Sequence, residues 1–283
     1  MSLKNWLLLI ILSIVWGGSF YFVEKSLLYF SFGQVVFFRV FFAALFIMLI
    51  LVVKKIKIIY DLNLWIIFFI MGVLNNVIPF LGITYAQESI TASLASLFNA
   101  TTPIFTAILA HFLTKDEKIS QSKVVGILVG FVGMVILLIP KGFGNFQLAG
   151  FFAITAAISY AFAGVFGKRL KKYNPILNVF GMLSASSIIM YILFFTSINS
   201  LEVKSFYEFK DLILLAVVST SIAYIIYFKL LFNVGAVKLL LVTYLIPISA
   251  SVLGIFLLDE KFTINMLVGT IVIFISLWLI NKR

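Results

Sequence analysis

Long apolar runs alternate with short polar segments along the whole chain. Ten runs can be distinguished, each near the roughly 20 residues that an α-helix needs to cross a membrane. The segments between them are short, so no stretch remains for a separate soluble domain. We therefore expect an all-α integral membrane protein with ten transmembrane helices. Their expected limits are about 6–23, 33–53, 64–86, 91–113, 121–139, 148–167, 176–198, 212–232, 236–257 and 264–280.

The basic residues between the runs indicate how the chain is oriented. The two termini and the even-numbered loops together hold 14 Lys and Arg residues, whereas the odd-numbered loops hold 5. Cytoplasmic loops of membrane proteins carry such an excess of Lys and Arg. The imbalance predicts a multi-pass protein of the cell (cytoplasmic) membrane with both termini in the cytoplasm. It leaves open whether the protein is a monomer or a homodimer.

The two halves of the chain resemble each other. Asp116–Lys118 follows the fourth run and Asp259–Lys261 follows the ninth, and each triplet precedes a glycine at the same spacing, Gly126 or Gly269. Each half holds five helices, an odd number, so the second copy must enter the membrane from the opposite side. Such inverted repeats are typical of secondary transporters, which bind their substrate near the midplane and expose it by alternating access. The expected repeats are residues 1–143 and 144–283.

Several short motifs lie at characteristic places along the chain. Val15–Phe20 reads Val-Trp-Gly-Gly-Ser-Phe, a Phe-Arg pair ends at Arg39, and the block Ala92–Glu117 returns as Ala236–Glu260. With the length and the duplication, these motifs resemble the EamA-like ten-helix carriers of the drug/metabolite transporter (DMT) superfamily. The resemblance implies a cavity lined by helices 3, 4, 8 and 9, with help from helices 1 and 6. It also implies export or exchange of amino acids or other small metabolites.

Polar side chains inside the predicted helices are candidates for solute binding. Such groups are costly in lipid and therefore face a cavity or another helix. Pro103 removes a backbone donor and frees a carbonyl one turn earlier, near Asn99, which favours a solute site there. Hydrogen bonds between helices are the alternative role. The candidate substrate-binding residues are Trp16, Ser19, Asn76, Asn99, Thr102, Tyr160, Tyr224 and Tyr244, and the expected helix breaks are Pro79, Pro103 and Pro247.

Arg39 is the most informative single residue, because it lies within the second run. It could extend toward lipid head groups. It could instead form a fixed ion pair with Glu24 or Glu88, both expected near the outer surface. The third possibility is a contact with the carboxylate of a substrate, to which a guanidinium is well matched.

The composition excludes several other classes of function. Hydrophobic residues make up 63% of the chain and charged residues 11%, so the net charge of +11 indicates membrane topology rather than nucleic-acid binding. With no cysteine and one histidine, the chain offers no thiolate chemistry and no multi-histidine metal site, and we expect no cofactor. No acid lies at the centre of a predicted helix. The residues therefore favour a secondary transporter rather than a membrane-embedded enzyme. The family resemblance implies that the transported solute is a small metabolite, an amino acid or a related compound, with a lipid or lipid-linked sugar flippase as the alternative.

Overall fold

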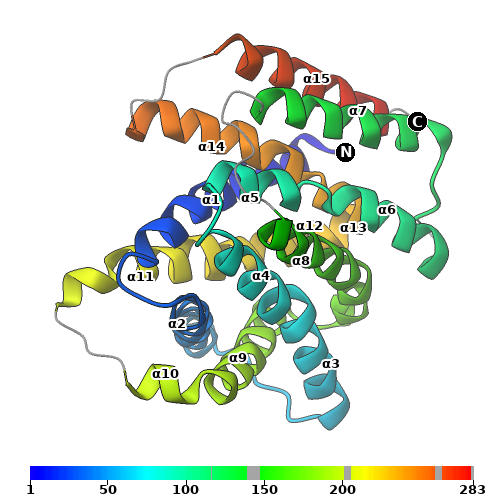
Figure 1. The fold of residues 1–283 in the computed structure, drawn as a ribbon. Coiled ribbons are helices and arrows are strands. Elements are labelled where there is room, and N and C mark those ends of the chain that lie inside the picture. Colours follow the sequence, from blue (N-terminus) through cyan, green and yellow to red (C-terminus); the bar gives the residue numbers. More distant parts are fainter. Residues whose placement is uncertain (116, 139–146, 201–204, 259–262, 282–283) are drawn as a thin grey trace.

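The computed structural model describes residues 1–115, 117–138, 147–200, 205–258 and 263–281. The described residues form helices and the connections between them, with no strand (Figure 1). The triplet Asp259–Lys261 and Asp116 lie outside the described residues. The α-helices are α1 Leu3–Ser26, α2 Phe32–Val53, α3 Leu62–Gly72, α4 Ile78–Ala86, α5 Ala92–Asn99, α6 Thr102–Leu113, α7 Gln121–Leu138, α8 Gln147–Phe166, α9 Pro175–Leu193, α10 Phe195–Asn199, α11 Lys210–Ala216, α12 Ala223–Val234, α13 Ala236–Leu240, α14 Val242–Leu258 and α15 Ile264–Asn281.

These helices cover each of the ten expected runs, but they differ in length and some runs are divided into two helices. Eight helical stretches are long and apolar enough to cross a membrane, and the two helices α7 and α15 are apolar but shorter. The expected helix over 176–198 ends earlier, because α9 stops at Leu193 and α10 forms a separate turn. The protein is thus an all-helical, multi-pass membrane protein.

The third and eighth runs share an unusual feature. A π-helical turn, Val73–Val77, separates α3 from α4, and another, Val217–Ile222, separates α11 from α12. The two turns begin 144 residues apart, as do α1 and α8, and also α5 and α13. The similarity of the two halves therefore extends from short sequence motifs to local irregularities of the backbone.

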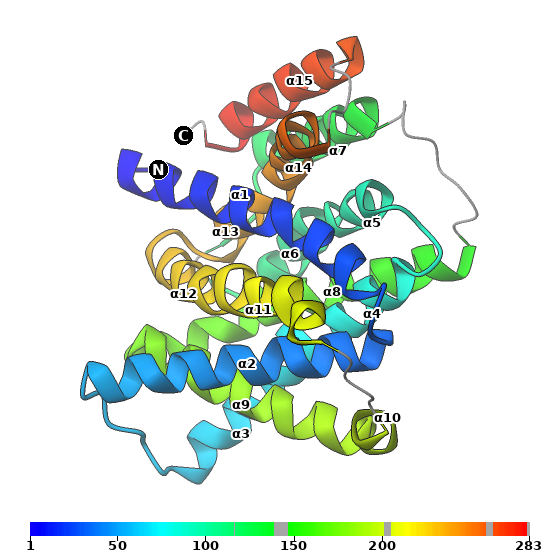
Figure 2. The same cartoon turned by 90° about the vertical axis from the view of Figure 1, so that its left-hand side faces the viewer.

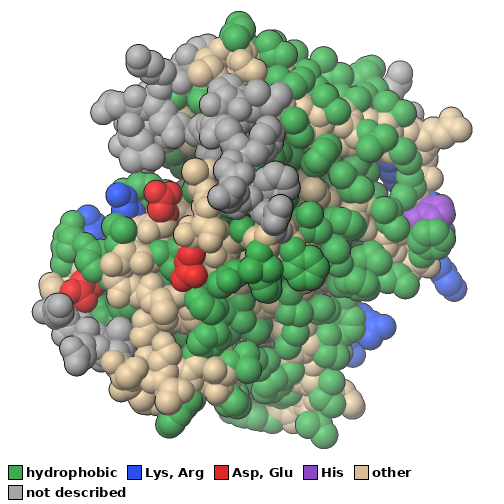
Figure 3. All heavy atoms as spheres, viewed as in Figure 1, with side chains coloured by type: hydrophobic (Ala, Val, Ile, Leu, Met, Phe, Trp, Pro, Cys, Tyr) green, Lys and Arg blue, Asp and Glu red, His purple; other side chains and the backbone are tan. Residues whose placement is uncertain are grey.

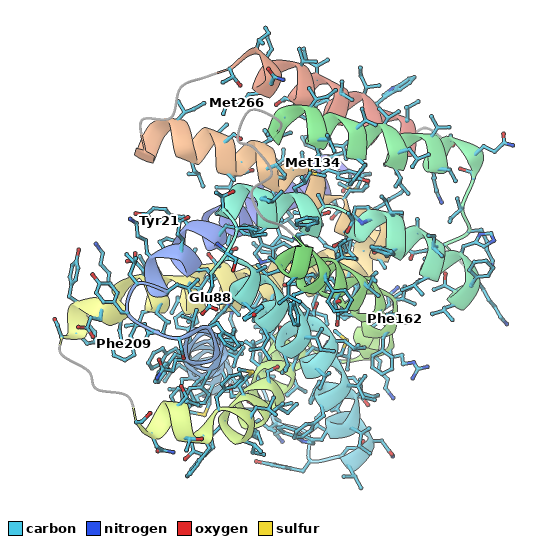
Figure 4. The ribbon with its side chains drawn as sticks, viewed as in Figure 1. Tyr21, Glu88, Met134, Phe162, Phe209 and Met266 are labelled. Carbon is cyan, nitrogen blue, oxygen red and sulfur yellow. The ribbon has the colours of Figure 1, made fainter. Side chains whose placement is uncertain are left out.

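The two halves pack together through matching pairs of helices. The helix α1 packs against α14, α8 packs against α6 and α4, and α2 lies along α9. The most extensive contact joins α7 and α15, which lie side by side at one edge of the molecule (Figures 1 and 2). Glycines permit this approach, since a Cβ on Gly269 would lie 2.6 Å from the Gly133 carbonyl oxygen. Met134 of α7 and Met266 of α15 are buried beside this contact (Figure 4).

The distribution of side chains is that of a protein immersed in lipid. Large apolar side chains cover the outside, for example Leu49, Val53 and Trp278, which are each at least 60% exposed. On the face seen in Figure 3, charged side chains gather at two opposite edges and hydrophobic ones fill the band between them. Polar side chains such as Asn75 and Asn76 are instead buried. Lipid cannot satisfy polar groups, so these side chains must find partners inside the helix bundle.

Candidate functional site

A small cavity lies at the centre of the bundle, between the two halves. It measures about 40 Å³ when only the space open to the centre of a water molecule is counted, which is room for roughly three water molecules. Eight α-helices, together with Gln87 just past the end of α4, contribute to its wall. The lining residues are Trp16, Ser19, Phe20 and Val23 of α1, Arg39 of α2, Phe80 and Ile83 of α4 with Gln87, Asn99 of α5, Tyr160 of α8, Tyr227 of α12, Leu240 of α13, and Thr243 and Ile246 of α14.

Helical periodicity explains which side chains meet at this cavity. Trp16, Phe20 and Val23 recur at four and three residues along α1, and so lie on one face of that helix. Phe80 and Ile83 do the same on α4, and Gln87 continues their face just past the end of the helix. The wall is therefore built from one face each of several helices.

Arg39 is buried at this cavity, with 6% of its surface exposed. Its Nε donates a hydrogen bond to Thr220 Oγ1 at 2.9 Å, and its Cζ lies 3.5 Å from the centre of the Phe80 ring. The burial contradicts extension toward head groups. Glu24 and Glu88 are both exposed, and neither forms an ion pair with Arg39, so the ion-pair expectation is also wrong. Glu88 is labelled in Figure 4.

The partner of Arg39 comes from the π-helical turn Val217–Ile222. The Thr220 hydroxyl donates to the Leu215 carbonyl at 2.9 Å, so its lone pairs remain to accept from Arg39. The neighbouring hydroxyl of Ser219 donates to the Val15 carbonyl of α1 at 3.1 Å. The π turn thus ties α11 and α12 to α1 and α2 next to the cavity. Such turns inside α-helices are frequent at functional sites.

Two fully buried polar atoms of cavity-lining residues have no hydrogen-bond partner among the described residues. These are the Tyr227 hydroxyl and the Gln87 Oε1, although the Gln87 Nε2 donates to the Phe20 carbonyl at 3.1 Å. Aromatic rings flank them, since the Trp16 ring lies 6.1 Å from that of Tyr227. Buried polar groups left unpaired are costly, and a ligand or a bound water satisfies them. The cavity therefore combines one cation, unpaired neutral polar groups and aromatic walls.

The structure brings together five of the residues singled out from the sequence: Trp16, Ser19, Arg39, Asn99 and Tyr160 all line the cavity. The others serve helix contacts outside it. The hydroxyl of Tyr224 donates to the Asn75 carbonyl and that of Tyr244 to the Ile127 carbonyl. The Asn76 Nδ2 donates to Ser186 Oγ, and the Thr102 hydroxyl donates to the Asn99 carbonyl. That last bond occupies the carbonyl expected to be free for a solute.

The three prolines have different effects on the backbone. Pro103 is the second residue of α6, just after the interruption at Ala100 and Thr101. Pro79 is the second residue of α4, just after the π-helical turn. Pro247 differs from expectation, because it lies inside α14, and the interruption falls at Leu241 instead. The discontinuities at Ala100 and Leu241 each directly follow a cavity-lining residue, Asn99 and Leu240.

A second and larger cavity opens on the side that carries the termini. It measures about 470 Å³ and holds Glu117 with four lysines, namely Lys123, Lys168, Lys171 and Lys238. We call it the basic vestibule. It is one helical turn from the central cavity, because Leu231 of α12 and Val237 of α13 line the vestibule, while Tyr227 and Leu240 of the same helices line the central cavity.

Glu117 and Gly235 meet at the wall of this vestibule. Glu117 Oε2 lies 3.9 Å from Lys168 Nζ. Gly235 joins α12 to α13 with φ 85° and ψ 173°, a conformation essentially confined to glycine. A Cβ at Gly235 would collide with the Glu117 carboxylate. The connection between α12 and α13 therefore packs directly against the Glu117–Lys168 ion pair. This contact lies at the vestibule end of the helical turn that separates the two cavities, which we call the partition.

The two similar halves agree with a comparison to known families. The sequence profile of the EamA-like transporter family matches residues 4–139 and again residues 147–282. The chain belongs to this family. The expected membership of the DMT superfamily is thereby confirmed, and the two matches give the two-repeat architecture.

Several relatives carry names that describe transport. An uncharacterized transporter of Archaeoglobus fulgidus is 27% identical over 99% of this chain and 100% of its own. A probable amino-acid metabolite efflux pump of Escherichia coli is 26% identical over 66% of this chain and 67% of its own. An S-adenosylmethionine uptake transporter of Rickettsia prowazekii is 31% identical, over 56% of this chain and 52% of its own. These relatives are transporters rather than enzymes.

A solved crystal structure shares the fold. It superposes with a TM-score of 0.75 at 16% sequence identity, and the match covers 98% of this chain and 97% of that one. At this level of identity the likeness concerns the arrangement of the helices alone. The chain is thus a multi-pass membrane protein of a transporter family, and the substrate must be argued from the cavity itself.

Proposed function

We propose that this protein carries a small metabolite with an acidic group, an amino acid or a related compound, across the cell membrane by alternating access. The observation that carries the proposal is Arg39, a buried guanidinium that faces the central cavity and forms no ion pair with any described residue. An unpaired charge inside a membrane protein is expensive and marks a functional site. A substrate carboxylate is the partner that its planar, forked donors fit.

The proposed transport cycle follows from the size and place of the cavities. The central cavity holds only a few water molecules, so a metabolite must widen it, and a partition one helical turn thick separates it from the basic vestibule. The discontinuities at Ala100 and Leu241 are places where α5 and α13 can move against α6 and α14. We propose that ten membrane crossings in two inverted repeats, residues 1–143 and 144–283, open the cavity to each side in turn.

Solute counterflow in proteoliposomes tests the carrier proposal. Vesicles that contain the protein are loaded with an excess of an unlabelled carboxylate, and a trace of the labelled compound is added outside. We expect transient uptake of label above its equilibrium level, because a carrier exchanges solute for solute. Simple equilibration without an overshoot would indicate a channel. Absence of uptake for every carboxylate tested contradicts the proposal.

A lipid flippase is the second candidate, and one feature favours it. A groove of about 370 Å³ lies between α4 and α8 and is almost wholly apolar, so it suits an acyl chain rather than a metabolite. Its lining residues are Phe32, Ile78, Leu81, Gly82, Tyr85, Phe152 and Thr155. Transfer of a fluorescent lipid between leaflets of the same vesicles, without counterflow of any carboxylate, would favour this alternative.

The proposed orientation places both termini in the cytoplasm. The chain contains no cysteine, so single cysteines can be introduced without a background. We expect a membrane-impermeant maleimide to label Tyr207→Cys on intact cells, because Tyr207 is 67% exposed on the side opposite the termini. Lys172→Cys, which is exposed near the vestibule, should react only after the cells are permeabilised. The reverse pattern would overturn the orientation.

A further inference from the structure

The charge at the central cavity is not balanced by the protein. Among the described residues, Arg39 is the one charged side chain that lines the cavity. Glu24 and Glu88, the two acids expected as possible partners of Arg39, are exposed at helix ends. The other described acids, Asp61, Glu117, Glu208 and Asp211, lie outside the cavity as well. A buried cation without a counter-ion favours a ligand of opposite charge, because that ligand removes the cost of the unpaired charge.

The same argument separates two kinds of carboxylate. A monoanion neutralises Arg39 and leaves the occupied cavity uncharged. A zwitterionic amino acid brings a second cation, its ammonium group, into a site where no described acid can accept it. A zwitterion has no net charge, so the occupied site would again be positive. Like charges within a poorly solvated site also oppose each other.

The neutral groups at the cavity fit a hydroxyl better than an ammonium. The Gln87 Oε1 is an acceptor without a partner, and the Tyr227 hydroxyl can donate. A substrate hydroxyl both donates and accepts, so it can satisfy either group. An ammonium only donates and would leave the tyrosine proton unpaired. The rings of Trp16, Phe20 and Phe80 supply the apolar remainder of the wall.

The basic vestibule has the same preference for negative charge. Lys123, Lys168, Lys171 and Lys238 face it, and Glu117 is the one acid among the described residues that line it. A concave surface lined by one sign of charge raises the local concentration of oppositely charged solutes. Since α12 and α13 line both cavities, an anion drawn into the vestibule lies one helical turn from the central site.

We propose that the substrate is a small hydroxycarboxylate that carries a net charge of −1, bound with its carboxylate on Arg39 and its hydroxyl on Tyr227 or Gln87. The proposal rests on the proposed function, because it names the class of solute for the same site. It is narrower than that function, because a carrier of zwitterionic amino acids would agree with the proposed function but would contradict the hydroxycarboxylate proposal.

Matched pairs of compounds test this proposal. Lactate is compared with alanine, and 3-phenyllactate with phenylalanine, by thermal stabilisation of the purified protein at equal ionic strength. We expect the hydroxy acid of a pair to bind at least about tenfold more tightly than the amino acid of the same skeleton, through ligand-linked stability. Equal or tighter binding of the amino acid, or no binding by either hydroxy acid, overturns the proposal.

A variant experiment separates a specific hydroxyl contact from a general effect of anions. Tyr227→Phe and Gln87→Leu should weaken the binding of 3-phenyllactate several-fold, whereas the binding of 3-phenylpropionate, which lacks the hydroxyl, should stay unchanged. Equal losses for both acids would contradict the assigned hydroxyl site. If neither hydroxy acid binds but another carboxylate shows counterflow, the hydroxycarboxylate proposal is contradicted, whereas the proposed carrier function is supported.

Discussion

Replacing Arg39 by glutamine is expected to reduce carboxylate binding by at least about 30-fold. The guanidinium offers charge-assisted hydrogen bonds worth about 1.5–3 kcal/mol each, and glutamine retains a polar side chain near Thr220 without the charge. The melting temperature of the ligand-free variant should not fall, because the substitution removes an uncompensated buried charge. Isothermal titration of the purified variant measures the first effect and thermal unfolding the second.

Arg169→Gln is the matched control for this variant. Arg169 also stacks on a phenylalanine, with its Cζ 4.6 Å from the ring centre of Phe166, but it is exposed. It should leave carboxylate binding unchanged. Arg39→Lys adds a second test, because a lysine keeps the charge but loses the planar fork and the stacking on Phe80. Wild-type affinity in Arg39→Gln would show that the guanidinium does not hold the substrate.

Replacing Gly235 by alanine should impair both stability and transport. The backbone conformation at Gly235, φ 85° and ψ 173°, costs a residue with a Cβ about 1–3 kcal/mol. The new Cβ would also displace the Glu117 carboxylate, which lies 3.9 Å from Lys168. We expect a melting temperature several degrees lower, and a slower counterflow because the partition beside the vestibule is disturbed. Thermal unfolding and counterflow measure the two effects.

Gly18→Ala controls for the loss of a glycine as such. A Cβ at Gly18 would come no closer than 3.7 Å to its neighbours, and alanine is the better helix former. This variant should therefore unfold at or above the wild-type temperature. Adding Glu117→Ala to Gly235→Ala removes the collision but leaves the backbone strain, so only part of the stability should return. A Gly235→Ala protein that unfolds and transports like the wild type would refute the role assigned to this connection.

The sequence predicts the helices well because lipid imposes one strong rule. A chain in the membrane must satisfy its backbone within helices, so long apolar runs locate them directly. Local irregularities are harder to predict. The π-helical turn at Val217–Ile222 contains no proline or glycine, whereas the turn at Val73–Val77 is followed by Pro79, an expected helix break. The interruption near Leu241 could not be predicted either, because Pro247, the proline expected to break this helix, lies inside the continuous helix α14.

The site could be predicted in part, and the division has a physical cause. Polarity within an apolar run identified Trp16, Asn99 and Arg39, because such residues must face the interior of the bundle. It could not separate residues at the cavity from residues between helices, so Tyr244 was indistinguishable from Tyr160 although its hydroxyl is bonded to α7. Phe80 and Gln87 also line the cavity but were not predicted. In the sequence, a phenylalanine that faces the cavity cannot be distinguished from one that faces lipid, and Gln87 lies just past the end of the third apolar run.

The central claim is that Arg39 holds the acidic group of the substrate inside the central cavity. The most direct test is an experimental structure with the hydroxycarboxylate that stabilises the protein most strongly. We expect ligand density in a widened cavity beside Trp16 and Tyr160, with a carboxylate within hydrogen-bond distance of the terminal nitrogens of Arg39. Ligand in the basic vestibule or in the groove between α4 and α8, with no ligand atom near Arg39, would contradict the claim.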